Sequence, residues 1–227
     1  MKIQIAPSIL SADFAALGAD CKRVLDAGAD VLHFDVMDGN FVPNISFGVP
    51  ILTSLHRALP QAVYDVHLMV REPLRYVKAF AAAGASWLTF HCEANSPVEE
   101  TIDAIRAAGV RTGVSIKPDT PVQDVFCVLD KIDLVLVMSV EPGAGGQAFL
   151  PQSLQKIALL RKEADARGLS DLCIEVDGGI TPQNAALCAE AGADCLVAGS
   201  AVFAKPDYAQ AIRALRDACG TKQNGGV

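Results

Sequence analysis

The sequence predicts an α/β protein of the (β/α)8 barrel class, also called a TIM barrel. Three observations predict it: short apolar runs recur along the chain, amphipathic stretches separate them, and an Ala-Gly junction ends several of these stretches. The runs are continuous in Val, Ile and Leu, which is typical of parallel strands buried on both faces. About eight such units in about 220 residues favour a closed barrel. An open, doubly wound sheet of about six strands is the alternative, because periodicity alone does not establish closure.

The predicted strands are the apolar runs, which are short and are bounded by polar or glycine-containing segments. In chain order they are residues 3–10, 31–37, 63–70, 87–91, 112–116, 134–140, 172–176 and 195–198.

The predicted helices are the amphipathic stretches between these runs. In chain order they are residues 14–27, 49–58, 73–83, 98–108, 122–129, 153–167, 182–191 and 208–218. Glycine follows four of them, at Gly28, Gly84, Gly109 and Gly192, and the next strand begins within a few residues. Glycine is the usual residue just past a helix end, so each junction predicts a C-cap and a short return loop.

The composition predicts one globular domain. The 227 residues are 51% hydrophobic with a mean hydropathy of +0.31, which excludes a disordered or low-complexity chain. A linker-like segment occurs only at the end of the chain. We therefore expect a single barrel over residues 1–220 and a frayed tail over residues 221–227.

Charge and cysteine content limit the partners and the compartment. The chain has 19 Lys and Arg against 26 Asp and Glu, a net charge of −7 and a pI near 5.0, which disfavours nucleic acid and anionic membranes as partners. The first residues do not form a signal peptide, and no apolar run approaches the length of a transmembrane helix. Seven cysteines without ligand-type spacing indicate reduced, mostly buried thiols of a cytoplasmic protein.

Reactive side chains collect at the predicted strand ends, where β/α barrels carry their active sites. Because side chains alternate along a strand, His33, Asp35 and Met37 share one face of the second strand. On the third strand, His67 shares a face with Asp65 and Met69 in the same way. Asp177 ends the seventh strand.

Four of these side chains form a candidate metal site. His33, Asp35, His67 and Asp177 offer two imidazoles and two carboxylates, which suit Zn²⁺, Fe²⁺ or Mn²⁺ better than Mg²⁺ or Ca²⁺. The alternative is that each side chain only satisfies a local hydrogen bond, but four together at strand ends favour a site. Glu175 lies deeper, and we interpret it as structural.

Methionine and the remaining histidines give further candidates. Apart from Met1, the methionines are Met37, Met69 and Met138, and each lies at the end of a predicted strand. They form either a polarisable wall around a site or part of the core. His91 ends the fourth strand and could line the same opening. His56 lies in a helical stretch and is expected at the surface.

Glycine-rich loops follow the sixth, seventh and eighth predicted strands. They are EPGAGGQAF at 141–149, Gly178-Gly179 and Gly199-Ser200. Such loops let backbone N–H groups approach a phosphate closely, although glycine pairs also make ordinary turns. The three loops contain no Lys or Arg, so amide dipoles would hold the anion. Their joint position predicts a phosphorylated substrate.

Long motifs then identify a resemblance. The chain closely resembles the ribulose-phosphate 3-epimerase family from about residue 3 to residue 216, through APSILSADF at 6–14, HFDVMDG at 33–39, FVPN at 41–44, DVHLMV at 65–70 and the glycine loops. The resemblance implies a barrel of the ribulose-phosphate-binding type. It also implies metal-dependent, reversible epimerisation at C3 of D-ribulose 5-phosphate to D-xylulose 5-phosphate in the pentose phosphate pathway. One divalent ion per subunit is expected, Zn²⁺ in first place with Fe²⁺, Mn²⁺ or Co²⁺ as alternatives, and members often form homo-oligomers.

The resemblance also implies roles for residues at matching positions. His33, Asp35, His67 and Asp177 match the metal ligands, with Asp35 also the proton acceptor and Asp177 the proton donor. The substrate-binding positions are Ser8, His67, Gly143, Ala144, Gly145, Gly146, Asp177, Gly178, Gly179, Gly199 and Ser200. Two positions depart from the family pattern: Asn40 replaces a common His, and Ala144 replaces a common Phe.

The expected mechanism needs two bases, because inversion next to a carbonyl removes a proton from one face and returns one to the other. Asp35 and Asp177 come from separate parts of the barrel wall and could flank a flat ene-diolate. Three alternatives are a D-allulose-6-phosphate 3-epimerase, a metal-dependent sugar-phosphate decarboxylase or lyase with a catalytic Lys, and a non-catalytic phosphate-binding barrel. The second lacks support in the His-Phe-Asp and Asp-Val-His strands, and the third would be favoured if either Asp were replaced.

Overall fold

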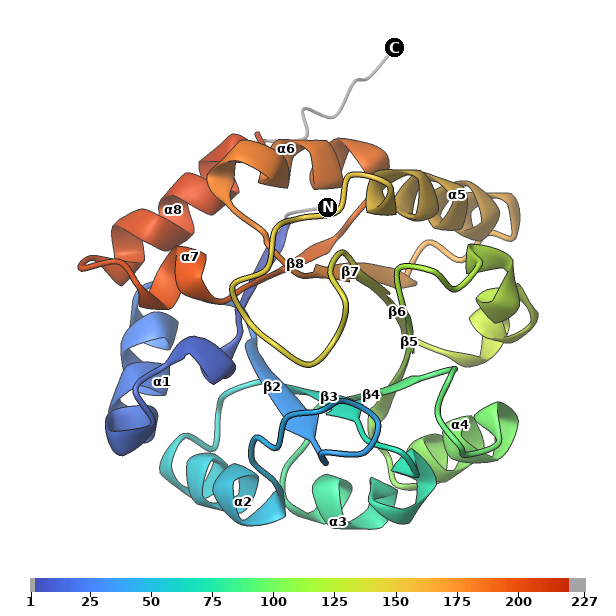
Figure 1. The fold of residues 1–227 in the computed structure, drawn as a ribbon, viewed down its shortest axis with the longest axis horizontal. Coiled ribbons are helices and arrows are strands. Elements are labelled where there is room, and N and C mark those ends of the chain that lie inside the picture. Colours follow the sequence, from blue (N-terminus) through green and yellow to red (C-terminus); the bar gives the residue numbers. More distant parts are fainter. Residues whose placement is uncertain (1–2, 221–227) are drawn as a thin grey trace.

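The computed structural model describes residues 3–220, which form a barrel of strands inside a ring of helices (Figure 1). Its eight strands form one parallel sheet in the order β1-β8-β7-β6-β5-β4-β3-β2. A parallel bridge between Ser8 and His33 joins the two outer strands β1 and β2. The predicted barrel is therefore confirmed and the open sheet is wrong. The predicted tail at 221–227 lies outside the described residues.

The strands agree with the predicted runs to within a few residues. They are β1 Gln4–Pro7, β2 Leu32–Met37, β3 Tyr64–Met69, β4 Trp87–His91, β5 Arg111–Ile116, β6 Leu134–Met138, β7 Cys173–Asp177 and β8 Cys195–Ala198. The first strand is shorter than predicted because Ile9–Ser11 turns into a short 3₁₀ helix, η1.

The helices cover the outside of the sheet (Figure 1). They are α1 Leu17–Asp26, α2 Val49–Ala58, α3 Val77–Ala82, α4 Val98–Ala107, α5 Ser153–Ala166, α6 Pro182–Ala191, α7 Ser200–Phe203 and α8 Tyr208–Ala218, with further 3₁₀ helices η2 Phe14–Ala16, η3 Pro73–Arg75 and η4 Val122–Lys131. The short helix α7 was not predicted. Within residues 3–220, no helix is long and apolar enough to cross a membrane.

One helical stretch takes a different form from the amphipathic α-helix that the pattern suggests. Residues Val122–Lys131 form a 3₁₀ helix, and Val122, Val125 and Val128 are buried. A spacing of three places these side chains in one row of a helix with three residues per turn. Leu129 is buried as well, so the apolar spacing fits both helix types and does not by itself explain the tighter one.

The main core lies between the strands and the helices, and a smaller apolar cluster lies inside the barrel. Met37, Val42 and Met69 form a third cluster at the end where the strands finish. All seven cysteines are free, and four of them are buried. The expectation of reduced, mostly buried thiols agrees with this arrangement.

The junctions between helices and strands confirm the predicted C-caps. Gly28, Gly84, Gly109 and Gly192 all have positive φ, between 74° and 115°. Two of these junctions continue into an aspartate whose carboxylate accepts a backbone N–H of a neighbouring strand. Asp30 accepts from Ile5 at 2.9 Å, and Asp194 accepts from Ile174 at 3.0 Å. These aspartates therefore lie at the end of the barrel opposite the predicted site.

Candidate active site

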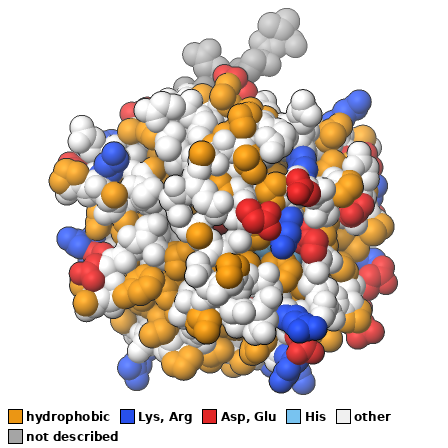
Figure 2. Space-filling view, in the orientation of Figure 1, with side chains coloured by type: hydrophobic (Ala, Val, Ile, Leu, Met, Phe, Trp, Pro, Cys, Tyr) orange, Lys and Arg blue, Asp and Glu red, His pale blue; other side chains and the backbone are white. Residues whose placement is uncertain are grey.

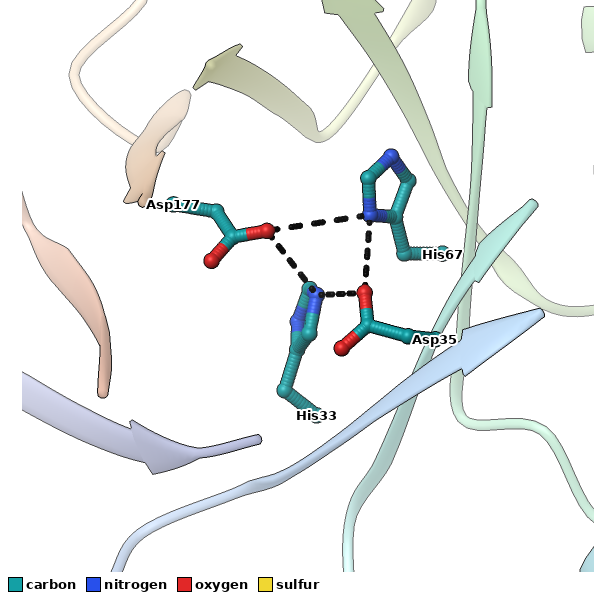
Figure 3. Close-up of side chains that lie close together, drawn as sticks. All are labelled: His33, Asp35, His67 and Asp177. Atoms are coloured by element: carbon teal, nitrogen blue, oxygen red, sulfur yellow. Dashed lines mark hydrogen bonds and ion pairs between the residues drawn. The ribbon is translucent and has the colours of Figure 1, made fainter. Parts of the chain in front are cut away.

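Four polar side chains converge at the carboxyl ends of β2, β3 and β7 (Figure 3). Asp35 Oδ1 lies 3.2 Å from both His33 Nε2 and His67 Nδ1. Asp177 Oδ2 lies 3.9 Å from His33 Nε2 and 4.0 Å from His67 Nδ1. The sequence placed these four residues at strand ends, and the structure brings all four together.

His33 is buried and held from behind by a carboxylate. Its Nδ1 lies 2.5 Å from Asp65 Oδ2, while its Nε2 faces the cluster and makes no hydrogen bond. Burial alone would lower the pKa of His33, but the carboxylates of Asp35 and Asp65 outweigh it and hold the pKa well above its usual range. In the protein without metal, this imidazole therefore carries a proton that a bound cation would displace.

His67 is also buried, but a second histidine supports it. Its Nε2 lies 2.9 Å from His91 Nε2, and His91 Nδ1 lies 3.1 Å from Glu93 Oε2. Burial lowers the pKa of His91 to about 4, so this imidazole is neutral. The structure places His91 behind the cluster and in contact with a member of it.

The two aspartates of the cluster have opposite electrostatic environments. Burial favours the neutral form of Asp35, but the charges and hydrogen bonds of His33 and His67 outweigh it and hold the pKa below its usual range. Ser8 Oγ also donates to Asp35 Oδ2 at 2.6 Å. Burial and then the negative charge of Asp35 raise the pKa of Asp177 to about 6. One carboxyl group is thus kept ionised while the other readily takes a proton.

These residues fit a divalent metal ion. One ligand atom from each of the four side chains lies within 4.8 Å of the other three. The buried Nε2 of His33 lacks a hydrogen-bond partner among the described residues, so no hydrogen bond there competes with a metal ion that displaces its proton. Imidazole and carboxylate donors together suit transition metals and zinc. The cluster could therefore bind such an ion.

A cavity of about 390 Å³ opens beside the cluster. Its wall includes all three predicted methionines, both aspartates of the cluster and the predicted glycine loops. The predicted residues among its lining are Ser8, Asp35, Met37, Met69, Met138, Gly143, Ala144, Gly145, Gly146, Asp177, Gly178, Gly179, Gly199 and Ser200. None of the described residues that line it is Lys or Arg, as the sequence predicted. In Figure 2, uncharged atoms likewise dominate the centre of this face.

The loop between β6 and α5, drawn in yellow in Figure 1, lies over the strand ends and lines this cavity. Asn44 Nδ2 in the loop after β2 donates to the Gly143 carbonyl at 2.6 Å, which joins the two loops. Gly179 has a φ of 64°, and a Cβ there would lie 2.5 Å from the backbone nitrogen of Phe149. Glycine is therefore required for the close approach of these loop backbones.

Ser139 fixes the turn that carries Asp177. Its hydroxyl donates to the carbonyl oxygens of Asp177 at 2.9 Å and Gly178 at 2.7 Å, and its N–H donates to Asp177 O at 2.8 Å. The end of β6 thus determines where the end of β7 presents its carboxylate.

Three side chains outside the cluster bear on the sequence predictions. Glu175 lies inside the barrel, where burial and then Asp65 raise its pKa well above the usual range. His56, expected at the surface, is half-buried with its ring 6.0 Å from that of Tyr64, so that expectation is wrong. Glu93 was missed, and it lies in the turn after β4, two residues beyond His91.

The fold and the site together define a β/α barrel with a candidate metal centre at its strand ends. Beside this centre lies a glycine rim, made of the loops at 143–146, 178–179 and 199–200, in which the described cavity lining contains no Lys or Arg. Residues 4–203 match the model of the ribulose-phosphate 3 epimerase family. The chain belongs to this family, so the resemblance seen in its motifs is confirmed.

Curated relatives agree with this assignment. The chain is 51% identical over 214 residues to a ribulose-phosphate 3-epimerase of Bacillus subtilis, covering 94% of this chain and 98% of that protein. It is 50% identical over 212 residues to a ribulose-phosphate 3-epimerase of Escherichia coli K12, covering 93% and 94%. A rice protein named a cytoplasmic isoform of ribulose-phosphate 3-epimerase is 47% identical over 225 residues, covering 97% and 96%.

More distant solved structures share the fold. A structure titled as KGPDC from Streptococcus mutans has a TM-score of 0.70 at 17% identity and covers 96% of this chain and 98% of that one. A 3-hexulose-6-phosphate synthase has a TM-score of 0.66 at 20% identity, covering 96% and 99%. These likenesses establish the barrel alone.

Proposed function

We propose that this protein catalyses the reversible epimerisation at C3 of D-ribulose 5-phosphate to D-xylulose 5-phosphate, as an isomerase of the pentose phosphate pathway. The observation that carries this proposal is the pair Asp35 and Asp177, which reach one cluster from different strands with pKa values displaced in opposite directions. Inversion of a carbon beside a carbonyl needs such a pair, with a base on one face and an acid on the other.

In this mechanism Asp35 removes the C3 proton, because its environment keeps it ionised. Asp177 holds a proton more readily and delivers it to the opposite face of the flat ene-diolate. In the reverse direction the two residues exchange roles. Ser8, which donates to Asp35 Oδ2 at 2.6 Å, holds this carboxylate in one orientation.

His33, Asp35, His67 and Asp177 would hold the metal ion, for which we propose Zn²⁺, with Fe²⁺, Mn²⁺ or Co²⁺ as alternatives. A bound divalent ion would act as a Lewis acid that stabilises negative charge on the substrate oxygens. The two histidines hold their rings in place through hydrogen bonds on the side away from the cluster. Such outer contacts orient metal-binding histidines.

The glycine rim would hold the substrate phosphate through backbone N–H groups, since no Lys or Arg lines the described cavity wall. The residues proposed for this contact are Gly143, Gly145, Gly146, Gly178, Gly179, Gly199 and Ser200. Met37, Met69 and Met138 would supply an apolar wall beside the reacting carbons.

The second candidate is epimerisation of D-allulose 6-phosphate. Ala144 favours it, because this small side chain lines the cavity in the loop that covers the strand ends. A cytoplasmic location and a homo-oligomeric state remain part of the proposal, and the name of the rice relative supports the former.

The test is conversion of D-ribulose 5-phosphate by the purified protein, with D-allulose 6-phosphate measured beside it. Each assay is repeated after chelation and after restoring the metal. We expect metal-dependent turnover with preference for the pentose. Preference for the hexose would change the substrate, and no turnover by folded, metal-loaded protein would refute the enzymatic proposal in favour of a phosphate-binding barrel.

A further inference from the structure

A chain of hydrogen-bonding side chains leads from His67 away from the candidate metal site. His67 Nε2 lies 2.9 Å from His91 Nε2, and His91 Nδ1 lies 3.1 Å from Glu93 Oε2. Both histidine side chains are fully buried, and their ring centroids lie 5.0 Å apart. The proposed chemistry does not use His91 or Glu93.

The surrounding loop fixes the outer end of this chain. Glu93 Oε1 accepts a hydrogen bond from the backbone N–H of Lys117 at 2.8 Å and a short one from the hydroxyl of Thr120. The ammonium group of Lys156 holds the same loop by donating to the carbonyl oxygens of Lys117 and Thr120, at 2.9 Å and 2.5 Å. The Glu93 carboxylate is thus anchored through one oxygen, and its other oxygen is aimed at His91.

This anchoring determines the direction of every bond in the chain. A carboxylate that receives two donors on one oxygen can only accept on the other, so His91 Nδ1 carries a proton. A buried neutral imidazole then has a lone pair on Nε2, which accepts the Nε2–H of His67. His67 therefore keeps a proton on Nε2, which leaves Nδ1 as the atom that can bind a metal ion.

Nδ1 is the atom of His67 that faces the cluster, 3.2 Å from Asp35 Oδ1 and 4.0 Å from Asp177 Oδ2 (Figure 3). A lone pair beside two carboxylate oxygens is stabilised when a cation lies among them. The opposite tautomer would direct a proton into that position and remove the ligand.

We propose that His91 and Glu93 are positioning residues that set the tautomer of His67 so that Nδ1 is the metal-binding atom. This inference rests on the metal site of the proposed function. It assigns to β4 and the loop after β5 a part in metal binding, although neither contributes a ligand.

The two ligand histidines are therefore supported in different ways. Asp65 contacts the ring of His33 directly, at 2.5 Å from Nδ1. The ring of His67 reaches its carboxylate through a second imidazole. In this relay the outermost carboxylate, Glu93, can be changed without touching the ligand ring itself.

The variant Glu93→Gln tests the direction of the relay with little change of shape. The glutamine carbonyl oxygen is needed by the N–H of Lys117 and the hydroxyl of Thr120, so its NH₂ group faces His91 Nδ1 and donates to it. His91 Nε2–H then donates to His67 Nε2, which becomes the unprotonated nitrogen of that ring. The matched control is Glu141→Gln, which removes the same charge from an exposed residue whose carboxylate lies 3.4 Å from Lys117 Nζ.

The first measurement uses metal-free protein and records the ¹⁵N chemical shifts of the His67 ring. We expect a protonated Nε2 in the wild type and in Glu141→Gln, and an unprotonated Nε2 in Glu93→Gln. The second measurement is the Zn²⁺ dissociation constant by chelator competition, which should rise about 10- to 100-fold in Glu93→Gln and change little in Glu141→Gln.

If Glu93→Gln does not fold, His91→Phe takes its place, because it keeps a ring and removes both nitrogen atoms; the same rise in dissociation constant is expected. Unchanged Zn²⁺ affinity in folded Glu93→Gln or His91→Phe, or a protonated His67 Nε2 in Glu93→Gln, would overturn the relay. Both measurements are made without substrate, so they are independent of whether the wild type turns over the proposed pentose phosphate.

Discussion

The two ends of the barrel use aspartate in opposite ways. Where the strands begin, Asp194 accepts the N–H of Ile174 and pairs with the guanidinium of Arg161. Where the strands end, Asp35 and Asp177 lie beside each other with two buried histidines. Where the strands begin, the Asp194 carboxylate is paired with hydrogen-bond donors. Where the strands end, the carboxylates of Asp35 and Asp177 lie beside each other and beside two imidazoles that can bind the same protons.

This difference separates stability from chemistry within one fold. The aspartate that follows an Ala-Gly-Ala junction joins a helix end to the neighbouring strand, so it stabilises the barrel. At the other end the pKa values of Asp35 and Asp177 are displaced in opposite directions, which suits proton transfer, and the raised pKa of Asp177 costs stability at neutral pH. We therefore expect substitutions at the two ends to affect different measured quantities.

The largest expected effect is on catalysis, in Asp177→Asn. An amide cannot deliver the proton to the second face, so kcat for epimerisation should fall by roughly 10³-fold. Slow exchange of the C3 proton with solvent should persist, since Asp35 still removes it. The measurements are turnover of D-ribulose 5-phosphate and deuterium uptake at C3. Substantial epimerisation by metal-loaded Asp177→Asn would contradict the two-base mechanism.

The next effect is on stability, in Asp194→Ala at the opposite end. This change leaves the guanidinium of Arg161 and the N–H of Ile174 without their carboxylate, in surroundings where the Asp194 side chain is only 9% exposed. We expect a loss of about 3 kcal/mol in the free energy of unfolding, measured by urea denaturation. At temperatures where the variant is folded, kcat should match the wild type.

The control for Asp194→Ala is Asp130→Ala, which removes a carboxylate that is 65% exposed and lies 3.5 Å from Arg167. Its unfolding midpoint should stay close to that of the wild type, because exposed pairs contribute little. Equal destabilisation by the two variants would show that the buried aspartate has no special role in joining strands.

A third effect concerns the stability of the metal-free protein as a function of pH. Because the fold raises the pKa of Asp177 from 3.8 to about 6, the folded state binds this proton more tightly than the unfolded chain. Stability should therefore fall as the pH rises from about 4 through 6. Asp177→Asn removes this loss and should be more stable than the wild type by roughly 1 to 3 kcal/mol at pH 7.5.

Chemical denaturation of chelator-treated protein at pH 4.5 and pH 7.5 measures this effect. The gain in Asp177→Asn should be present at the higher pH and small at the lower one. A variant that is less stable than the wild type at both values would show that the strand-end carboxylates stabilise the fold, and the contrast between the two ends would disappear.

The sequence predicted the strand-end cluster because alternation along a strand is a local property. His33 and Asp35 lie two residues apart on β2, so their side chains share one face of the strand. His67 pairs with Asp35 on the neighbouring strand β3, so it lies on the same face of the sheet. Long motifs then supplied the roles of Asp35 and Asp177. The junction glycines were predicted for the same local reason, since a positive φ is required at a helix end.

Features that depend on distant contacts were not predictable in this way. The relay from His67 needs the loop after β5 to present the N–H of Lys117 and the hydroxyl of Thr120 to Glu93. No pattern in the sequence states which loop lies beside that carboxylate. His56 was misplaced for the same reason, because the ring of Tyr64, from another element, covers it.

The smallest expected effect is in Arg216→Met, which tests whether the two ends are independent. Arg216 on α8 donates through Nη2 to the carbonyl oxygen of Gly28 at 3.0 Å and pairs with the carboxylate of Asp30. Methionine keeps the apolar part of the side chain and removes the charge. With the Arg216 side chain 26% exposed, we expect a loss of about 1 kcal/mol in the free energy of unfolding.

Arg216→Met should leave kcat and the Zn²⁺ dissociation constant at wild-type values, because Asp30 precedes β2 while His33 and Asp35 lie further along it. A change in either constant without a change in stability would mean that strand β2 transmits a displacement from one end to the other. The barrel would then no longer separate the residues that stabilise it from those that react, and the contrast drawn from the aspartates would hold only for β7 and β8.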